Sequence, residues 1–148
     1  MIEVGLCKAH EHQKDNFDLI KELSRIQDYI NKNNYSVLEG MVDFLILGAY
    51  YNDFEKKTLF TAVLTNNTGK AICEYHSVVR IACKDDEKIE FAKMTMDFDK
   101  EFLGTIENER AVLLHLNIPT RGLREDMAIR LSSLVVKVDD TRVTYDEQ

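Results

Sequence analysis

Two stretches of alternating apolar and polar residues limit most strongly what this chain can fold into. They run from Thr58 to Thr65 and from Arg110 to Ile118. A period of two places successive side chains on opposite faces of a strand, one face in a core and the other in water. The first run leads into the turn residues Asn66-Asn67-Thr68-Gly69, and the second is expected to end at Pro119, the only proline. Such turn-rich connections favour antiparallel hairpins over crossover helices.

Further strands are expected where apolar side chains recur at every second position or on both faces. These segments are residues 37–51, 72–83, 89–98 and 134–138, the last followed by a turn at Asp139-Asp140. Gly40 and Gly48 mark expected bends or bulges in the first of them. The pattern therefore predicts about six to eight antiparallel strands.

A single amphipathic helix is predicted from residue 15 to residue 31. Its apolar side chains recur at intervals of three and four, at Phe17, Ile20, Leu23, Ile26 and Ile30. Asp15 or Asn16 would cap its first turn. Two interpretations of the apolar stripe stay open: it covers a face or an edge of the sheet, or it docks a partner or a second copy.

The length of 148 residues is that of one domain with a sizeable core. We expect a single domain over residues 1–148, with an N-terminal segment and helix in residues 1–35 and the strands in residues 36–148. The predicted fold class is mainly β, as an antiparallel immunoglobulin-like β-sandwich with one N-terminal amphipathic helix.

The charge of the chain argues against anionic partners. Its 26 acidic and 19 basic residues give a formal net charge of −7. A surface for nucleic acid or for an anionic membrane needs clustered lysine and arginine, whereas the basic residues here are scattered among acidic ones. We therefore expect no nucleic acid and no membrane as a partner.

The sequence predicts a cytoplasmic protein. No apolar run reaches the roughly 18 residues of a membrane-spanning helix, and the longest, residues 44–51, is interrupted by Gly48. The first residues include Glu3 and lack a basic start with an apolar segment after it, so no signal peptide is predicted. Reduced thiols are accordingly expected at Cys7, Cys73 and Cys83.

Cys7, His10 and His12 have the spacing C-x2-H-x-H near the N-terminus. Thiolate and imidazole are good zinc ligands, so these residues could form a site if a fourth ligand reached them. The spacing is not that of a common zinc finger or ribbon, and the alternative is a loose N-terminal segment. We therefore assign no metal to the chain.

The connection after residue 50 is rich in aromatic side chains. Tyr50, Tyr51 and Phe54 are the candidate partner-binding residues, because exposed aromatic side chains in a connection can anchor a protein partner. The alternative is that the tyrosines cap an edge of the core, with the ring buried and the hydroxyl in water.

Four segments carry a resemblance to a known family. They are Leu59–Asn67, Ile81–Phe98, Leu103–Arg110 (Leu-Gly-Thr-Ile-Glu-Asn-Glu-Arg) and Leu116–Pro119 (Leu-Asn-Ile-Pro). Together they resemble the SLAP domain, a small β-rich module of Firmicutes associated with S-layer and accessory secretion proteins. The resemblance covers residues 59–123 and implies an immunoglobulin-like β-sandwich used for association, with no catalytic residue.

The sequence departs from the SLAP pattern at two places. Family members usually carry an aromatic residue, often tryptophan, shortly after the arginine, whereas this chain has Ala111-Val112 and no tryptophan. Some members also carry a proline within the stretch that matches residues 105–110, whereas this chain has Asn108 nearby instead.

No catalytic or cofactor-binding motif occurs, since G-x-G-x-x-G, P-loop and H-E-x-x-H patterns are absent from the sequence. Cys73 and His76 are three residues apart on an expected strand and would face opposite sides. We therefore expect no enzyme, no catalytic residue and no cofactor. The predicted function is a non-catalytic interaction or assembly module of a bacterial or phage accessory protein, which binds a protein partner or associates with itself as a homo-oligomer. The alternatives are a small-molecule-binding or sequestering protein with a pocket between sheet and helix, and an unrecognised hydrolase.

Overall fold

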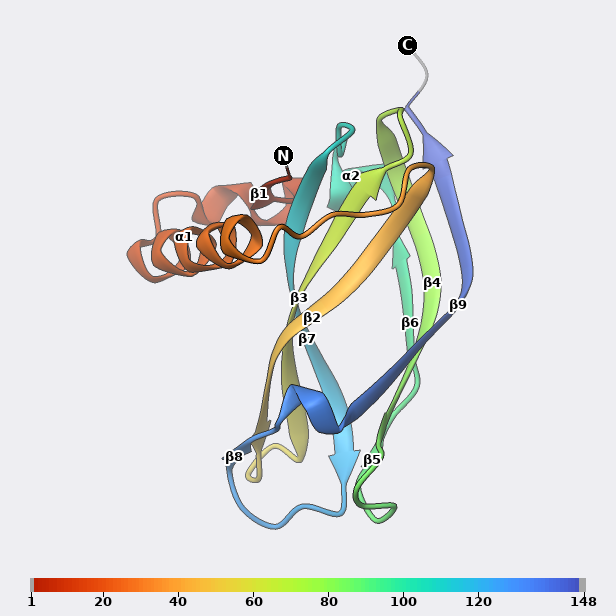
Figure 1. The fold of residues 1–148 in the computed structure, drawn as a ribbon. Coiled ribbons are helices and arrows are strands. Elements are labelled where there is room, and N and C mark those ends of the chain that lie inside the picture. Colours follow the sequence, from red (N-terminus) through yellow and green to blue (C-terminus); the bar gives the residue numbers. More distant parts are fainter. Residues whose placement is uncertain (1, 147–148) are drawn as a thin grey trace.

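The computed structural model describes residues 2–146 and is mainly β, as predicted (Figure 1). The strands are β1 (Glu3–Leu6), β2 (Met41–Asn52), β3 (Lys57–Asn67), β4 (Ile72–Cys83), β5 (Glu90–Phe91), β6 (Met94–Phe98), β7 (Arg110–Arg121), β8 (Met127–Ala128) and β9 (Leu134–Tyr145). The helices are α1 (Phe17–Lys32), the short α2 (Lys100–Leu103), and the 3-10 helices η1 (Lys8–Gln13) and η2 (Leu131–Ser133).

The strands of residues 2–146 form one nine-stranded sheet. Its order is β6-β4-β5-β7-β3-β2-β8, with β1 beside β7 and β9 beside β4. Every pairing is antiparallel except that of β1 with β7, which is parallel. The two alternating runs that dominate the sequence are direct neighbours, because β3 pairs with β7 from Lys57 opposite Pro119 to Asn66 opposite Arg110.

The two halves of the sheet face each other across one core. Figure 1 shows β2, β3 and β7 on one side and β4, β6 and β9 on the other, and the short β5 pairs with both β4 and β7. Buried side chains from both halves pack together, among them Phe60, Leu64, Leu114 and Leu116 from the first half and Ile72, Tyr75, Val79 and Met96 from the second. Burial of this apolar surface is the main stabilising contribution to the fold.

α1 covers the outer face of β3 and β7. Ile26 and Ile30 of the helix are buried against Val63, Ala111 and Leu113, which point away from the main core. The helix forms here because its apolar residues share one face and because the side chain of Asn16 accepts a hydrogen bond from Leu19 N at 3.1 Å. The apolar stripe therefore packs on the sheet.

The expectation of a loose N-terminal segment is wrong. β1 pairs in parallel with residues 110–113 of β7, and Ile2 and Cys7 on either side of it are buried. The side chain of Gln27 on α1 holds this strand, since its Oε1 accepts from Val4 N at 2.9 Å and its Nε2 donates to the Ile2 carbonyl at 2.8 Å. The sequence did not indicate β1 because a strand of four residues has too few positions to show a period.

β7 continues past its proline, so the strand end predicted at Pro119 is also wrong. Pro119 lies opposite Lys57 at the end of the pairing with β3, and its carbonyl accepts from Ala92 N at 2.9 Å. Beyond it, Thr120 and Arg121 pair with β5. A proline is tolerated in a strand where no neighbour needs its missing N–H.

Two other strand boundaries differ from prediction because the chain changes partners. Residues 89–98 form two strands, since β5 pairs with both β4 and β7 whereas β6 pairs with β4. The turn predicted at Asp139-Asp140 is an irregularity within β9, where Asp140 has φ 54 and the register with β4 shifts between His76 and Val78. The bulge predicted near Gly48 is confirmed by a register shift between Ile46 and Gly48.

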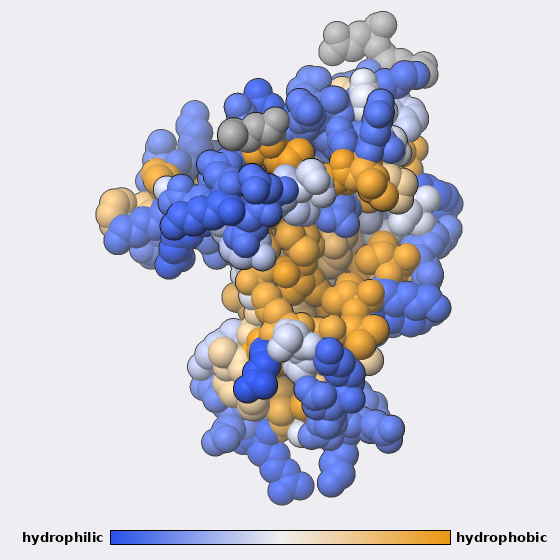
Figure 2. Space-filling view, viewed as in Figure 1, coloured by the Kyte–Doolittle hydropathy of each residue, from blue (hydrophilic) through white to orange (hydrophobic). Residues whose placement is uncertain are grey.

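β2 is an edge strand over most of its length. It pairs with β3 on one side, while β8 pairs with it on the other side only at Tyr50 and Tyr51. The side chains that β2 directs into the core are only partly buried before Ala49, at Val42, Phe44 and Ile46. Figure 2 shows apolar side chains gathered at the surface in the middle of this face.

Candidate functional site

The turn between β2 and β3 presents a highly exposed aromatic side chain. Phe54 is 95% exposed at the tip of this hairpin. The turn around it has a defined local conformation, because Asn52 Oδ1 accepts from Glu55 N at 3.1 Å and Lys56 adopts the left-handed region at φ 56. Phe54 thus projects into solvent from a turn whose flanking residues are held.

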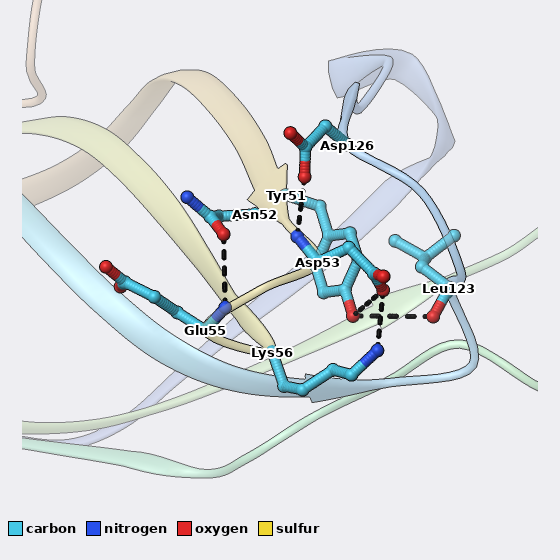
Figure 3. Close-up of polar contacts among 7 residues, drawn as sticks. All are labelled: Tyr51, Asn52, Asp53, Glu55, Lys56, Leu123 and Asp126. Carbon is cyan, nitrogen blue, oxygen red and sulfur yellow. Dashed lines mark hydrogen bonds and ion pairs between the residues drawn. The ribbon is translucent and has the colours of Figure 1, made fainter.

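Asp53 ties this turn to the loop that follows β7 (Figure 3). Its Oδ1 lies 2.7 Å from Lys56 Nζ and 3.1 Å from the hydroxyl of Tyr51. Its backbone N–H donates to Asp126 Oδ1 at 2.7 Å, and the Tyr51 hydroxyl is also 3.3 Å from the carbonyl oxygen of Leu123. The tip is therefore fixed from within the hairpin and from the neighbouring loop.

The polar contacts shift the ionisation of all three side chains of this cluster. The hydrogen bond from Lys56 is the main cause that lowers the pKa of Asp53, and the same bond raises the pKa of Lys56. Burial, followed by the hydrogen bond to Asp53, raises the pKa of Tyr51. At neutral pH the cluster therefore holds a carboxylate, an ammonium group and a neutral phenol.

We expect Asp53→Asn to weaken the acid dependence of stability. Because folding lowers the pKa of Asp53, its stabilising contribution is present above the unfolded-state value of 3.8 and is lost as the pH falls through the lower folded value. The free energy of unfolding of the wild type, measured by urea denaturation between about pH 6 and about pH 2, should fall more steeply than that of the variant. Asp85→Asn is the matched control, since Asp85 is exposed and has no polar side-chain contact among residues 2–146. Equal slopes for wild type and Asp53→Asn would contradict this prediction.

The structure separates the three predicted partner-binding residues. Tyr50 is 50% exposed and pairs across the strands with Leu59, which is 38% exposed, so both lie on the outer face. Tyr51 has no exposed surface, because the alternation of β2 turns it into the core. Tyr51 is therefore corrected from a contact residue to a buried support of the turn. We call Tyr50, Phe54 and Leu59 the hairpin surface.

Sequence reasoning missed the residues that hold this surface in place. Asp53 and Lys56 were visible as turn residues, but Leu123 and Asp126 lie about 70 positions further along the chain, with Asp126 73 positions after Asp53. Only the return of the chain after β7 brings them to the hairpin. Leu59 could have been found, since the alternation of β3 puts it on the face opposite Phe60.

A cavity of about 640 Å³ opens next to the hairpin. Its charged side chains are Lys56, Glu90 and Arg121, and its wall also includes Phe91 and Leu123. Lys56 already pairs with Asp53 at 2.7 Å, so the charges left to face a bound molecule are those of Arg121 and Glu90. One base and one acid side by side give this cavity no preference for an anion or a cation.

A second cavity, of about 310 Å³, lies between α1 and the sheet. Its lining includes Glu22, Arg25 and Tyr29 from the helix, Leu47, Gly48 and Thr61 from β2 and β3, and Leu131. A lining that combines apolar side chains with a few polar and charged groups is usual for a small-molecule pocket. This is the position at which the alternative function placed a pocket.

Two of the three residues considered as metal ligands, Cys7 and His10, lie together. Cys7 Sγ is 3.2 Å from His10 Nδ1, and the ring of His10 packs edge-on against Phe102 with centroids 5.5 Å apart. Burial raises the pKa of Cys7 and lowers that of His10, which disfavours a thiolate. Within residues 2–146 no group of three or more potential ligands could hold a metal ion. The pair packs η1 against α2.

The comparisons with known proteins give no relative: no protein-family model matches the chain, and no curated protein or solved structure does. No helix formed by residues 2–146 combines the length and the apolar character that crossing a membrane requires.

Proposed function

We propose that this chain is a non-catalytic protein-interaction or assembly module that contacts another protein, or a second copy of itself, through the hairpin surface. The observation that carries the proposal is the 95% exposure of Phe54 on a turn held by side-chain contacts on both sides. An aromatic side chain on a preorganised turn loses little conformational freedom on binding, which favours affinity. Tyr50 and Leu59 extend the apolar surface next to it.

Two sequence-based expectations belong to this proposal. The resemblance to SLAP modules favours an association role and an immunoglobulin-like β-sandwich, and the core shared by the two halves of the sheet supports a sandwich. A typical sandwich has two separate sheets, whereas here β5 pairs with strands of both halves and joins them into one sheet. A cytoplasmic location is also part of the proposal, and Cys7, Cys73 and Cys83 are free thiols, as a reducing compartment requires.

Site-specific photocrosslinking tests the proposal in cells that produce the protein. Benzoylphenylalanine at position 54 or position 50 should give a discrete protein adduct on irradiation. The same group at Glu87, an exposed residue of the turn between β4 and β5, should not. In parallel, Phe54→Ser should abolish co-purification of the adduct's partner while changing the free energy of unfolding by no more than about 0.5 kcal/mol. No adduct at positions 50 and 54, or an equal one at position 87, would overturn the proposal.

A second candidate function is the binding of a small molecule between α1 and the sheet. It is favoured by the cavity of about 310 Å³ at that place. A Cβ added at Gly48 would meet only the side chain of Thr61, at 3.7 Å, so a larger residue here has room to occupy the cavity.

A thermal-shift screen with nucleotides and metal ions distinguishes this second function. A ligand of this cavity should raise the Tm of the wild type, because it binds the folded state alone, and should fail to raise that of Gly48→Leu. Stabilisation of both proteins to the same extent would place the ligand elsewhere. If no compound in the screen stabilises the wild type, this function loses its support.

A further inference from the structure

On the face of the molecule that carries β2 and β9, these two strands do not pair with each other, and we call the interval between their edges the opening. β2 has no strand beside its outer edge from Met41 to Gly48, and β9 pairs with β4 alone, within the part of the chain that the structure describes. Backbone N–H and C=O groups on such edges are free to pair with an added strand. Below the opening, β8 and η2 cross between the halves, and Ile129 N donates to the Ala49 carbonyl at 2.9 Å.

Apolar side chains that point toward the core line this opening from both sides. Val42, Phe44 and Ile46 on β2 lie opposite the inward-facing Asn66, Leu64 and Ala62 of β3, yet they are only partly buried. On β9, Val136 and Val138 pair with the buried Ile81 and Val79 of β4, and Val136 is nevertheless 38% exposed. These side chains reach solvent because no strand bridges β2 and β9. The apolar area in the middle of Figure 2 lies over this region.

We propose that the opening between β2 and β9 binds an extended segment of another protein, which enters as an additional strand. The segment would pair with the free edge of β2, and its alternate side chains would cover Phe44, Ile46 and Val136. Main-chain hydrogen bonds provide affinity in such complexes, and the pockets for alternate side chains provide specificity. The proposal names a partner class for the interaction module described above and rests on that function.

We assign the partner as an extended, positively charged segment, because this chain carries a net negative charge. A second folded copy could pair one of its own sheet edges with β2, so charge is what separates the two kinds of partner. Each copy also carries a net charge of −7, so association between copies is opposed by charge repulsion, whereas a basic segment is attracted. The entering strand should therefore alternate apolar residues with lysine or arginine.

The β2 edge is the better of the two edges for pairing. Between Met41 and Gly48 its only charged residue is Asp43, whose Oδ2 accepts from the Tyr35 hydroxyl at 2.5 Å. β9 carries Lys137, Asp139, Asp140 and Arg142 and is interrupted at Asp140. Charged side chains and irregularities are the features that protect an edge from pairing. Protection of backbone amides from hydrogen exchange should accordingly be largest on β2.

The test uses the full chain and a capped, fluorescent peptide Val-Lys-Val-Lys-Val-Lys-Val as probe. Its binding is followed by anisotropy, and hydrogen exchange of residues 41–48 is measured with and without peptide. We expect binding with slower exchange on β2. Val136→Lys, which places a charge in the opening, should weaken the affinity by about tenfold or more. Val135→Lys is the matched control, since Val135 is adjacent, 51% exposed and outward-facing, and should change it by no more than about twofold.

A replacement variant and two control peptides complete the test. Val143→Lys, at the other end of the opening, replaces Val136→Lys if urea denaturation shows that the latter is unfolded. Binding of the block peptide Val-Val-Val-Val-Lys-Lys-Lys as tightly as the alternating one would overturn strand pairing. Equal binding of an alternating valine–glutamate peptide would overturn the basic partner. Concentration-dependent dimerisation that protects the β2 amides would assign the edge to a second copy instead.

The peptide-binding experiment and the crosslinking experiment test the two proposals separately. Crosslinking at positions 50 and 54 reports on the hairpin surface, which lies beyond the end of the opening. Adducts there without peptide binding would overturn the β2–β9 inference alone. Peptide binding without any adduct would overturn the hairpin surface as the contact and leave the opening as the binding site.

Discussion

Gly122→Ala is expected to lower the free energy of unfolding by at least about 3 kcal/mol, because two costs combine at this position. Gly122 has φ +95, a backbone conformation that residues with a Cβ rarely adopt. An added Cβ would also lie 2.0 Å from the carbonyl oxygen of Lys88 and 2.9 Å from Ile89 Cα. These are backbone atoms, so the loop after β7 and the segment before β5 would have to separate. Urea denaturation followed by circular dichroism measures the loss.

Gly69→Ala isolates the conformational part of this cost. Gly69 has a similar φ of +89, and nothing lies within 4 Å of a Cβ built there. The control should therefore lose only about 1–2 kcal/mol. Equal losses for the two variants would show that the loop after β7 adapts freely. Since this loop carries Leu123 and Asp126, the Gly122 variant should also lose the contacts that hold Phe54.

Phe60→Ala is expected to cost about 3–5 kcal/mol of the free energy of unfolding, the usual range for truncating a fully buried phenylalanine. Phe60 has no exposed surface and lies at the centre of the core, where its ring packs edge-on against Phe91 with centroids 5.5 Å apart. Removing the ring leaves a cavity between the two halves of the sheet. Chemical denaturation of wild type and variant under the same conditions gives the difference.

Leu59→Ala provides the comparison on the neighbouring residue of the same strand. Leu59 is 38% exposed on the outer face, so its truncation should cost no more than about 1 kcal/mol. A loss equal to that of Phe60→Ala would contradict the assignment of Leu59 to the exposed face of β3. A small loss for both would mean that the core collapses around the missing ring.

β2 links the two surfaces for which we propose partners. Its upper part, from Met41 to Gly48, forms one side of the opening toward β9, and Tyr50 begins the hairpin surface. The change occurs at the bulge near Gly48, below which β8 pairs with β2 and closes the edge. A partner bound in the opening and a partner bound at the hairpin would therefore contact the same strand.

Some helices and strands could be predicted from the sequence and others could not, and their length explains most of the difference. β3, β7 and α1 were recognisable because each buries one face over many residues, which leaves a period of two or of three to four in the sequence. β1, with four residues, and β5, with two, are too short to carry a period and are defined by the strands that they join. The expected strand end at Pro119 failed because a proline ends pairing only where its N–H is needed.

The candidate site was predictable only in part. The sequence indicated the aromatic hairpin, but Tyr50 and Tyr51 are adjacent residues of the same type. Only the alternation of β2 and the position of the core decide that Tyr51 is the buried one. The support from Asp126 and Leu123 depends on a return of the chain that no local pattern encodes.

By itself, the sequence determined the local preferences: which segments are strands, which is the helix, where several turns lie, and that the chain carries a net negative charge. Period, turn chemistry and charge depend on neighbouring residues, so they can be read along the chain. Tertiary structure alone decided that β9 joins β4 and not β2, and that an edge and part of the core are left open as a result. Strand pairing over long separations depends on the total burial and hydrogen bonding of the folded chain, and those quantities have no local signature in the sequence.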